Sequence, residues 1–341
     1  MATITGTSTA YSVSASSGVG GSNREDLEDV IYDLFPIDTW ALSNLAKSKA
    51  SATFHEWLGD EPAAAASNIN LEGDDATFAT IANPSRYGNY TQIYNKTFLI
   101  SGTQEVVAKA GRKSEIGRQA IRKMKELKRD IEFSLTRNAA GTAGSATVGR
   151  TSAGMESWIG ATTPSASTAT NVVLTTAAAS GTYTEVTSGA PTTGPTDTLP
   201  GSIAAFTEAA LNLALEGAWD DGGETDVLLM TPTNKNSFNE FTSIATRNID
   251  VGKGDQAFIV GASDVFVSSF GTHKVVQHRY MRNHSVLCLD SSLWGVATLR
   301  GFESIKLAKT GDGEKRLIQA ELCLRSNNWK GNSQVVGMAA T

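Results

Sequence analysis

The segment between Arg112 and Arg137 predicts one long helix, and that helix limits the folds open to the chain. Its apolar residues recur at spacings of three and four, which places them on one face. At 1.5 Å per residue, about 24 residues make a helix roughly 36 Å long. Such a helix packs its apolar face on other elements and leaves the opposite face exposed. The apolar positions are Ile116, Ala120, Met124, Leu127, Ile131 and Leu135.

The same segment carries a basic stripe, which consists of Arg118, Arg122, Lys125 and Arg129. The stripe starts two residues after the apolar one, and two residues turn a helix by about 200°, so the two stripes lie on opposite faces. Two interpretations are open. The basic stripe is an ordinary solvated face, or it receives an acidic partner.

Residues 50–85 form a long acidic segment without any Lys or Arg. A structureless segment of this length is improbable inside a compact domain. Either the segment is disordered, or something outside its own subunit orders it. It is also the obvious partner for the basic stripe, from the same subunit or from a neighbour. Its acidic residues are Glu56, Asp60, Glu61, Glu72, Asp74 and Asp75.

The N-terminal region divides into two parts. Residues 1–23 have no charged side chain and consist mostly of Ser, Thr, Gly and Ala, so on their own they are predicted to be flexible. Acidic residues after Asn23 and an apolar face then predict a short helix that Pro36 ends. The apolar positions of that helix are Leu27, Val30, Ile31 and Leu34.

The remaining chain predicts the α+β class. Residues 139–201 are rich in Ala, Thr, Ser and Gly, which predicts β-rich or mobile surface insertions and a poor core. Residues 202–217 predict an amphipathic helix ending at Gly217, residues 226–231 a buried strand, and TPTNKNSFNEF another helix. GDG at 311–313 predicts a hairpin turn between strands. The strand-like runs after Gly254 are AFIVGA, DVFVSSF, HKVVQHRYM, SVLCLD, SLWGVATL, ESIKLAK and RLIQAELCLRS.

Composition excludes several classes of protein. A net charge of −6 over 341 residues argues against nucleic-acid binding by bulk electrostatics. No apolar stretch approaches the roughly 20 residues that span a bilayer, and the N-terminus lacks the basic start and apolar region of a signal peptide. Two cysteines, Cys288 and Cys323, are too few for a disulfide framework or a zinc knuckle. We therefore expect a protein made in a reducing cytoplasm, with no membrane partner.

A search for catalytic or metal-binding residues yields no candidate. His55 and Glu56 resemble the start of a helical zinc motif, but Gly59 stands where its second histidine would be. Around Lys253 the glycines do not have the spacing of a phosphate-binding loop, and no G-x-S-x-G motif occurs. His273 and His278 are five residues apart, on opposite faces of a strand, and have no cysteine or paired acid nearby in sequence. We predict no enzyme activity, no metal and no cofactor.

Several segments resemble the SU10-type major capsid proteins of tailed double-stranded DNA bacteriophages. They include SATFHEWLGDEP, NLEGDDATF, MKELKRDIEFSL and GRTSAGMESWI, and the most specific are TQIYNKTFLISGTQ and AGRKSE. The resemblance runs from about Glu25 to the end and is weakest in 139–201.

The resemblance implies an HK97-like capsid fold with six segments. Residues 1–49 would be an N-terminal arm, 50–100 an extended E-loop, and 101–138 the peripheral domain with its spine helix. Residues 139–201 would be an insertion, 202–285 the axial domain, and 286–341 the returning strands of the peripheral domain with a C-terminal segment.

The implied function is self-assembly into the hexamers and pentamers of an icosahedral shell that encloses double-stranded DNA without sequence-specific binding. The implied partners are further copies of the chain, a portal protein, and possible separate scaffolding and decoration proteins. The location would be the virion, after assembly in the host cytoplasm. About 24 residues precede Glu25, so a scaffold would be a separate protein or a segment already removed.

Some shells of this fold join subunits covalently through an E-loop lysine. Here no Lys lies between Ala50 and Arg86, and Lys96 lies only near the base of the loop. We therefore predict a non-covalent shell.

Three alternatives remain. An encapsulin-like bacterial nanocompartment shares the fold but packages an enzyme. A Ser/Thr-rich adhesin or fibre protein would explain 139–201, although no fixed repeat is found. A hydrolase using His55 and Glu56 would need a second cluster of ligands.

One local hypothesis follows for the assembly surfaces. We expect the basic stripe, Arg118, Arg122, Lys125 and Arg129, to contact Glu72, Asp74 or Asp75 of an adjacent subunit. Exposed ion pairs contribute about 0–1 kcal/mol each, so their role would be register and choice of partner.

Overall fold

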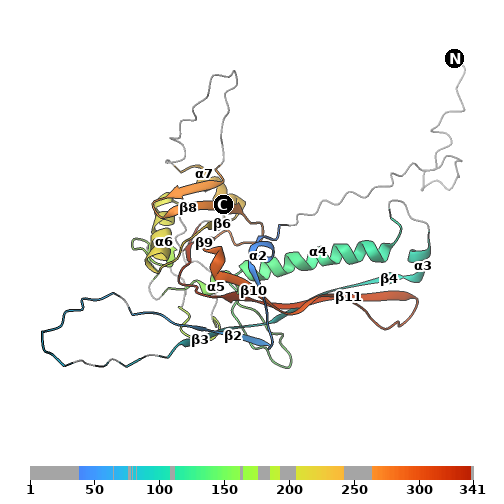
Figure 1. The fold of residues 1–341 in the computed structure, drawn as a ribbon. Coiled ribbons are helices and arrows are strands. Elements are labelled where there is room, and N and C mark those ends of the chain that lie inside the picture. Colours follow the sequence, from blue (N-terminus) through green and yellow to red (C-terminus); the bar gives the residue numbers. More distant parts are fainter. Residues whose placement is uncertain are drawn as a thin grey trace, which may run out of the picture.

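A computed structural model describes residues 38–338, apart from 64, 76–77, 79, 82, 108–111, 162–163, 176–184, 193–204 and 242–262. Figure 1 shows a body with two projections that leave it in opposite directions. One is the loop between two short strands. The other consists of a long helix on a long, narrow sheet.

The second projection is built on a four-stranded sheet. Its strand order is β1-β10-β11-β4, and β1 pairs with β10 in parallel while the other pairs are antiparallel. The long helix α4 (Glu115–Thr136) packs on β4 and β11. The bounds of the strands are Ala46–Lys49 for β1, Gln92–Ser101 for β4, Trp294–Lys306 for β10 and Gly313–Ser326 for β11.

The predicted long helix is confirmed. Ser114 caps its N-terminus by accepting a hydrogen bond from the backbone N–H of Gly117 at 3.2 Å. Leu127, Ile131 and Leu135 are buried against the sheet, whereas the side chain of Arg122 on the opposite face is 46% exposed. The hairpin predicted at GDG is also confirmed, because β10 and β11 pair antiparallel on either side of it.

The body contains a six-stranded sheet in the order β5-β12-β9-β6-β8-β7. Helices α6 (Glu208–Asp220) and α7 (Pro232–Asn239) contribute Leu211, Leu215 and Phe238 to the core on one side of it. The strand bounds are Val172–Leu174 for β5, Val227–Met230 for β6, Val265–Ser268 for β7, Gly271–Gln277 for β8, Ser285–Leu289 for β9 and Ser333–Val336 for β12. This sheet therefore draws strands from the predicted segments 139–201, 202–285 and 286–341.

A separate two-stranded sheet carries the other projection. Strands β2 (Phe54–Gly59) and β3 (Ser85–Tyr90) pair antiparallel, and the loop 60–84 between them extends away from the body (Figure 1). The remaining elements are short: α2 (Trp40–Asn44), α3 (Gly102–Val106), α5 (Met155–Trp158) and the 3₁₀ helix η1 (Ser291–Leu293).

The prediction that 139–201 makes a poor core is wrong for two parts of that segment. Met155, Trp158 and Ile159 are at most 1% exposed and join the main core, and all three residues of β5, an edge strand of the six-stranded sheet, are buried. The buried carboxylate of Glu156 also pairs with Arg282. A few large apolar residues are enough to bring parts of a polar segment into the core, because contacts with residues distant in sequence determine where they are buried.

The helix predicted at 202–217 begins later and ends later than expected. Thr207 is its cap, accepting from the backbone N–H of Ala210 at 3.3 Å. Gly217 lies within the helix and does not end it. A side chain is excluded at this position, because an added Cβ would come within 2.5 Å of the backbone of Thr170. Close packing against another segment, and not helix termination, explains this glycine.

The remaining strand predictions have mixed outcomes. β6 and α7 confirm the buried strand at 226–231 and the helix after it, while SLWGVATL and ESIKLAK merge into the single bulged strand β10. The strand predicted at AFIVGA, the helix predicted after Asn23, residues 1–23 and the Lys253 turn lie outside the described residues.

Candidate functional site

The loop 60–84 presents apolar side chains to solvent. Ile69, Leu71, Phe78 and Ile81 are between 81% and 96% exposed, far more than their chemistry favours. The same loop carries Asp60, Glu61, Glu72, Asp74 and Asp75 without a basic residue. No described residue of the body covers these side chains, so the loop has the character of a binding element whose partner surface lies elsewhere.

The base of this loop is held firmly. Trp57 of β2 packs on the buried Trp158, with ring centroids 5.5 Å apart. Asn89 of β3 is fully buried, donates to the backbone carbonyls of Ala153 and Leu324, and accepts from the backbone N–H of Ala153. The two strands therefore project the loop from a rigid base.

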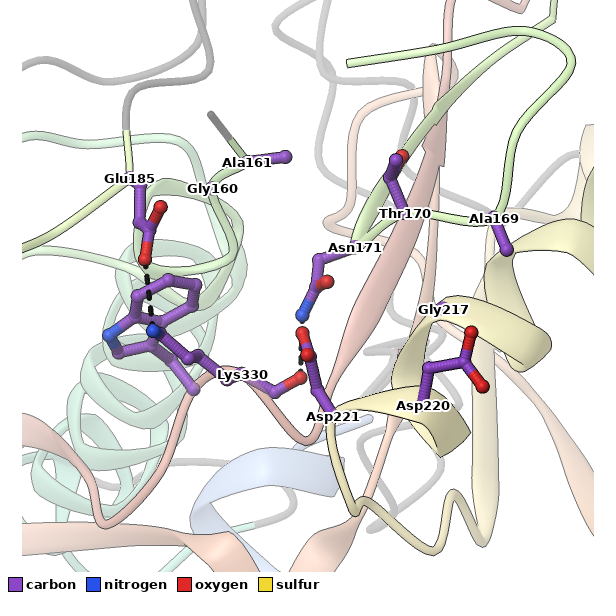
Figure 2. A pocket seen from close by; sticks show the side chains of 11 residues that line it. Gly160, Ala161, Ala169, Thr170, Asn171, Glu185, Gly217, Asp220, Asp221 and Lys330 are labelled. Atoms are coloured by element: carbon purple, nitrogen blue, oxygen red, sulfur yellow. Dashed lines mark hydrogen bonds and ion pairs between the residues drawn. The ribbon is translucent and has the colours of Figure 1, made fainter. Parts of the chain in front are cut away.

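Lys330 joins this base to the C-terminal part of the chain. Its ammonium group lies 2.8 Å from the carboxylate of Glu61 and 3.1 Å from that of Glu185. Burial alone would lower the pKa of Lys330, but the two carboxylates raise it above its ordinary value. Figure 2 shows Lys330 and Glu185 pointing toward one another at the edge of a cavity of about 290 Å³.

That cavity has no arrangement typical of a catalytic site. Asp220 and Asp221 line its far side at the end of α6, and burial raises the pKa of Asp221. Within the part of the chain that the structure describes, no group of three His, Cys, Asp or Glu residues is placed to hold a metal ion. Among the same residues, no helix combines the length and apolar character needed to cross a bilayer.

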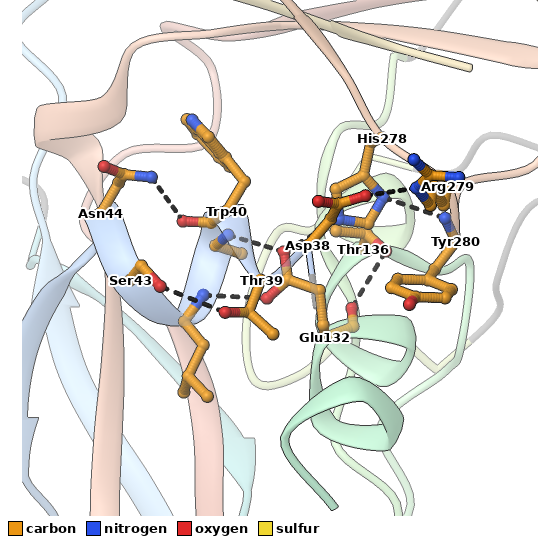
Figure 3. Close-up of polar contacts among 12 residues, drawn as sticks. Asp38, Thr39, Trp40, Ser43, Asn44, Glu132, Thr136, His278, Arg279 and Tyr280 are labelled. Atoms are coloured by element: carbon orange, nitrogen blue, oxygen red, sulfur yellow. Dashed lines mark hydrogen bonds and ion pairs between the residues drawn. The ribbon is translucent and has the colours of Figure 1, made fainter. Parts of the chain in front are cut away.

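A buried carboxylate anchors the start of the described chain. Glu132 of α4 is fully buried and accepts from the backbone N–H groups of Ala41 at 2.7 Å and Leu42 at 2.9 Å. Thr39, the N-cap residue of α2, makes no side-chain capping bond, so Glu132 supplies the negative charge that a helix N-terminus favours. His278 Nε2 lies 2.9 Å from the same carboxylate (Figure 3).

In the predicted basic stripe only Arg122 is exposed, whereas Arg118, Lys125 and Arg129 are half-buried, and part of the charge of the stripe is paired within α4. Arg118 lies 3.3 Å from Glu115, and Arg122 lies 3.3 Å from Glu126. Glu72, Asp74 and Asp75 lie in the loop on the other projection, so the structure does not bring the two predicted groups together within one chain.

The histidines and cysteines have structural partners. His273 bonds through its two ring nitrogens to Ser268 and to the carbonyl of Thr225, and burial lowers its pKa. His278 pairs with Glu132, an acid that lies far away in sequence. Burial raises the pKa of each thiol, Cys288 and Cys323, to about 12. Sequence reasoning missed the buried acids of α4, Glu115, Glu126 and Glu132, which lie three or four residues from members of the basic stripe and therefore on the same side of the helix.

A second exposed apolar surface lies toward the far end of the other projection. Its residues come from α3, α4, β4 and the β10–β11 hairpin, and they are between 36% and 87% exposed. They are Leu99, Val106, Val107, Ile121, Phe302, Ile305 and Leu307. The molecule thus carries unmatched apolar surface at both of its opposite ends (Figure 1).

Comparison with known proteins identifies the family. The profile of the SU10 major capsid protein family matches residues 3–339, almost the whole chain. The chain belongs to the SU10 major capsid protein family. It is also 26% identical over 314 residues to the major capsid protein of Escherichia phage Phieco32, covering 86% of this chain and 88% of that protein.

Solved capsids share the fold of this capsid protein. The capsid of an empty GTA particle superposes with a TM-score of 0.61 at 11% identity, covering 96% of this chain and 99% of that one. The SrpI encapsulin complex of Synechococcus elongatus gives 0.54 at 12% identity, covering 93% and 94%. The fold is the HK97-type α+β capsid fold, as predicted.

The family assignment resolves the main alternatives. The protein is a phage major capsid protein, a structural component of the virion. The encapsulin shares the fold at low identity, but the family profile and the phage relative give that interpretation no comparable support. The adhesin and hydrolase interpretations are likewise not supported. The two exposed ends are therefore candidate contacts between copies of one chain.

Proposed function

We propose that copies of this capsid protein contact one another head to tail, form hexamers and pentamers, and close an icosahedral shell around double-stranded DNA. The observation that carries this proposal is the loop 60–84, which has at least four strongly exposed large apolar side chains on a rigid base. Heterologous contacts between two different surfaces of one chain generate closed rings when the rotation permits. Multivalency then makes many modest contacts into a stable shell.

The structural units support a division of roles. We assign the arm to 1–49 and the E-loop to the β2–β3 hairpin within 50–100, since β4 pairs with β11 over its whole length. The spine helix is α4, in 101–138. Segment 139–201 is an insertion that contributes α5 and β5 to the body. The axial domain is centred on 202–285, with β9 and β12 from 286–341 completing its sheet.

Between copies, we assign the acidic loop to the basic stripe. Arg118, Arg122, Lys125 and Arg129 would lie against Glu72, Asp74 or Asp75 of the adjacent subunit. Because Arg118 and Arg122 already have partners on α4, each added pair would contribute little energy. Its effect would be on register and on the rate of encounter.

The chemistry of the chain suits an enclosing role without catalysis. A net charge of −6 disfavours tight electrostatic binding of DNA, so the genome would be held without sequence-specific contacts and could leave the shell. A portal protein, together with separate scaffolding and decoration proteins, would complete the particle, and assembly would take place in the host cytoplasm.

Electron microscopy and analytical ultracentrifugation of the full chain test the proposal. We expect closed particles of uniform size, and particles recovered from infected cells should contain double-stranded DNA. A cargo enzyme in place of DNA would favour the nanocompartment. A compact monomer at high concentration, with the loop against its own body, would refute assembly.

We also predict that the shell is non-covalent. The loop offers no lysine, and Lys96 of β4 pairs with Asp130 of the same chain at 2.5 Å. Denaturing gel electrophoresis of intact particles should therefore give a single band near 35.9 kDa. A ladder of covalent oligomers would contradict the prediction.

A further inference from the structure

A second cavity lies beside the base of the loop 60–84. It has a volume of about 210 Å³ and lies between the end of β2 and the segment that follows β11. A molecule of liquid water takes about 30 Å³, so the cavity has room for roughly seven waters, far more than a bare metal ion needs. Its lining includes three aromatic rings, two carboxylates and one hydroxyl, which belong to Trp57, Tyr87, Trp329, Asp60, Glu61 and Ser326.

The aromatic rings of this cavity are fixed by packing. Trp57 packs on the buried Trp158, with ring centroids 5.5 Å apart. Trp329 is 5% exposed and belongs to the main core. Tyr87 lies against Gly59, where an added Cβ would come within 2.7 Å of its ring. Aromatic rings attract a cation at their faces, so the cavity has a preformed wall of a kind that favours positive charge.

The charge around the cavity is negative. Asp60 and Glu61 line it, and none of the described lining residues is basic. The ammonium group of Lys330 lies just outside the lining and is shared by two carboxylates, 2.8 Å from that of Glu61 and 3.1 Å from that of Glu185. Asp60 has no ion-pair partner among the described residues. One positive charge is therefore set against three negative ones.

Lys330 shows that this part of the molecule accepts a primary ammonium group. Its nitrogen lies 5.5 Å from the centroid of the Trp329 ring, in addition to its contact with Glu61. A ring and a carboxylate thus hold one ammonium group beside the cavity. The cavity itself offers the same combination, with the rings of Trp57 and Tyr87 and the carboxylate of Asp60.

A hydroxyl group in the lining lacks a partner. Ser326 is 1% exposed, and its Oγ is buried without a hydrogen-bond partner among the described residues. An unpaired buried hydroxyl is costly, and most such groups in proteins have a partner. Because Ser326 lines the cavity, an N–H group bound there supplies the missing hydrogen bond by donating to Oγ.

We propose that this cavity binds a small organic cation through a primary ammonium or guanidinium group. The group donates to Ser326 Oγ and to the carboxylate of Asp60, and its alkyl part lies against the aromatic rings. A metal ion fits less well, because within the described chain no three His, Cys, Asp or Glu residues are placed to hold one. A neutral ligand would leave the excess negative charge unmatched. The site belongs to the single subunit and does not depend on the proposed assembly.

Titration of dilute, unassembled subunits tests the site. The probes are butylammonium and ethylguanidinium, and butanol is the neutral control of similar size. Calorimetry measures the affinity, and Trp57 and Trp329 report binding by a change in fluorescence. We expect both cations to bind saturably with a dissociation constant below about 10 mM, and butanol not to bind. Equal binding of butanol, or no saturable binding of either cation, would overturn the proposal.

Ser326→Ala separates binding from folding. The hydroxyl has no described partner in the free subunit, so its loss should leave the melting temperature unchanged or raise it. The affinity for butylammonium should fall about tenfold, because a hydrogen bond to a charged group is lost. An unchanged affinity would contradict the proposed site.

Asp60→Asn and Asp74→Asn form a matched pair in the exposed loop. Each removes one negative charge, but only Asp60 lines the cavity. We expect Asp60→Asn to weaken butylammonium binding about threefold, and Asp74→Asn to bind like the wild type. Equal weakening by both variants would make the amine a mere counter-ion of the acidic loop and would refute a specific site.

Assembled particles distinguish two sources of the cation. Butylammonium should still bind in particles if the natural ligand is a free amine, whereas a lysine or arginine side chain of another copy would block the cavity. Both results support a cation site. A chain that binds the cations as a subunit but forms no particles would refute the proposed function and leave the cation site standing.

Discussion

The body and the loop 60–84 differ in the burial of their side chains. In the body, the buried carboxylate of Glu132 has three hydrogen-bond partners, and Trp158 and Leu287 are fully buried. In the loop, Phe78 is 96% exposed and Ile81 90%. The body therefore derives its stability from within one chain, whereas the loop gains the burial of its apolar groups only when a second surface covers it. Substitutions in the two regions should accordingly separate folding from assembly.

The largest effect is expected for Glu132→Ala in the body. The change leaves two backbone N–H groups of α2 and the ring of His278 without their buried partner. Removing one member of a buried pair costs about 3–5 kcal/mol, and we expect a loss of that size in the free energy of unfolding. Urea denaturation of dilute, unassembled subunits measures it. Glu132→Gln keeps the size of the side chain and one acceptor oxygen and should lose less; equal losses would show that the carboxylate with both of its oxygens, and not the size of the side chain, provides the stability.

A smaller effect, of a different kind, is expected for Phe78→Ser in the loop. The side chain is exposed in the subunit, so the free energy of unfolding should change by less than about 0.5 kcal/mol. Full burial of a phenylalanine contributes about 1.5–3 kcal/mol, which corresponds to roughly a tenfold to hundredfold rise in the subunit concentration required for assembly. Sedimentation of a dilution series measures this. Unchanged assembly would mean that the loop end stays uncovered.

The next effect concerns acid stability in the long sheet. Glu321 is 3% exposed; burial alone would raise its pKa, but the hydrogen bond from Thr91 and the guanidinium groups of Arg300 and Arg150 hold the pKa below its ordinary value. A lowered folded pKa contributes stability above the unfolded pKa of about 4.3, and this stability is lost as the pH falls through the folded value.

Glu321→Gln should therefore cost about 1 kcal/mol of unfolding free energy at pH 7, because two of its charged partners are partly solvated. The difference from the wild-type subunit should shrink below pH 4. Urea denaturation at pH 7 and pH 3 measures both values. A difference that is the same at the two pH values would show that the carboxylate charge contributes nothing.

The smallest effect is expected for Arg122→Glu on the exposed face of α4. Its pair with Glu126 contributes about 0.3–0.5 kcal/mol, so the circular dichroism of the subunit should stay the same. Assembly should weaken in low salt and recover in part at high ionic strength, since salt screens the repulsion from the acidic loop. Assembly that is unaffected in low salt would make the stripe a solvated face only.

Elements with a local signal could be predicted from the sequence. The spacing of Leu127, Ile131 and Leu135 predicts α4 and its buried face, and Ser114 marks its start. The buried strand β6 and the β10–β11 hairpin are equally local. The segment around Trp158 could not be predicted, because its composition is that of a loop and only contacts with distant residues make it part of the core.

The candidate site was predicted in part. The acidic, lysine-free loop and the basic stripe are both visible in the sequence, and the structure adds the exposure of Phe78 and Ile81 and the open edge of β10. The open side of β10 could not be predicted, because the sequence of a strand has the same pattern whether one or both of its sides are hydrogen-bonded to neighbouring strands.

The sequence by itself determined the long helix with its two faces, the pattern of strands and an acidic loop that cannot build its own core. These features depend on periods of two and of three to four residues, which neighbouring residues encode. Only the tertiary structure decided which groups meet. Glu132 and His278 are 146 positions apart, and Asn89 bonds to a carbonyl 235 positions away. Such pairs depend on how the sheets stack, and no local pattern records that.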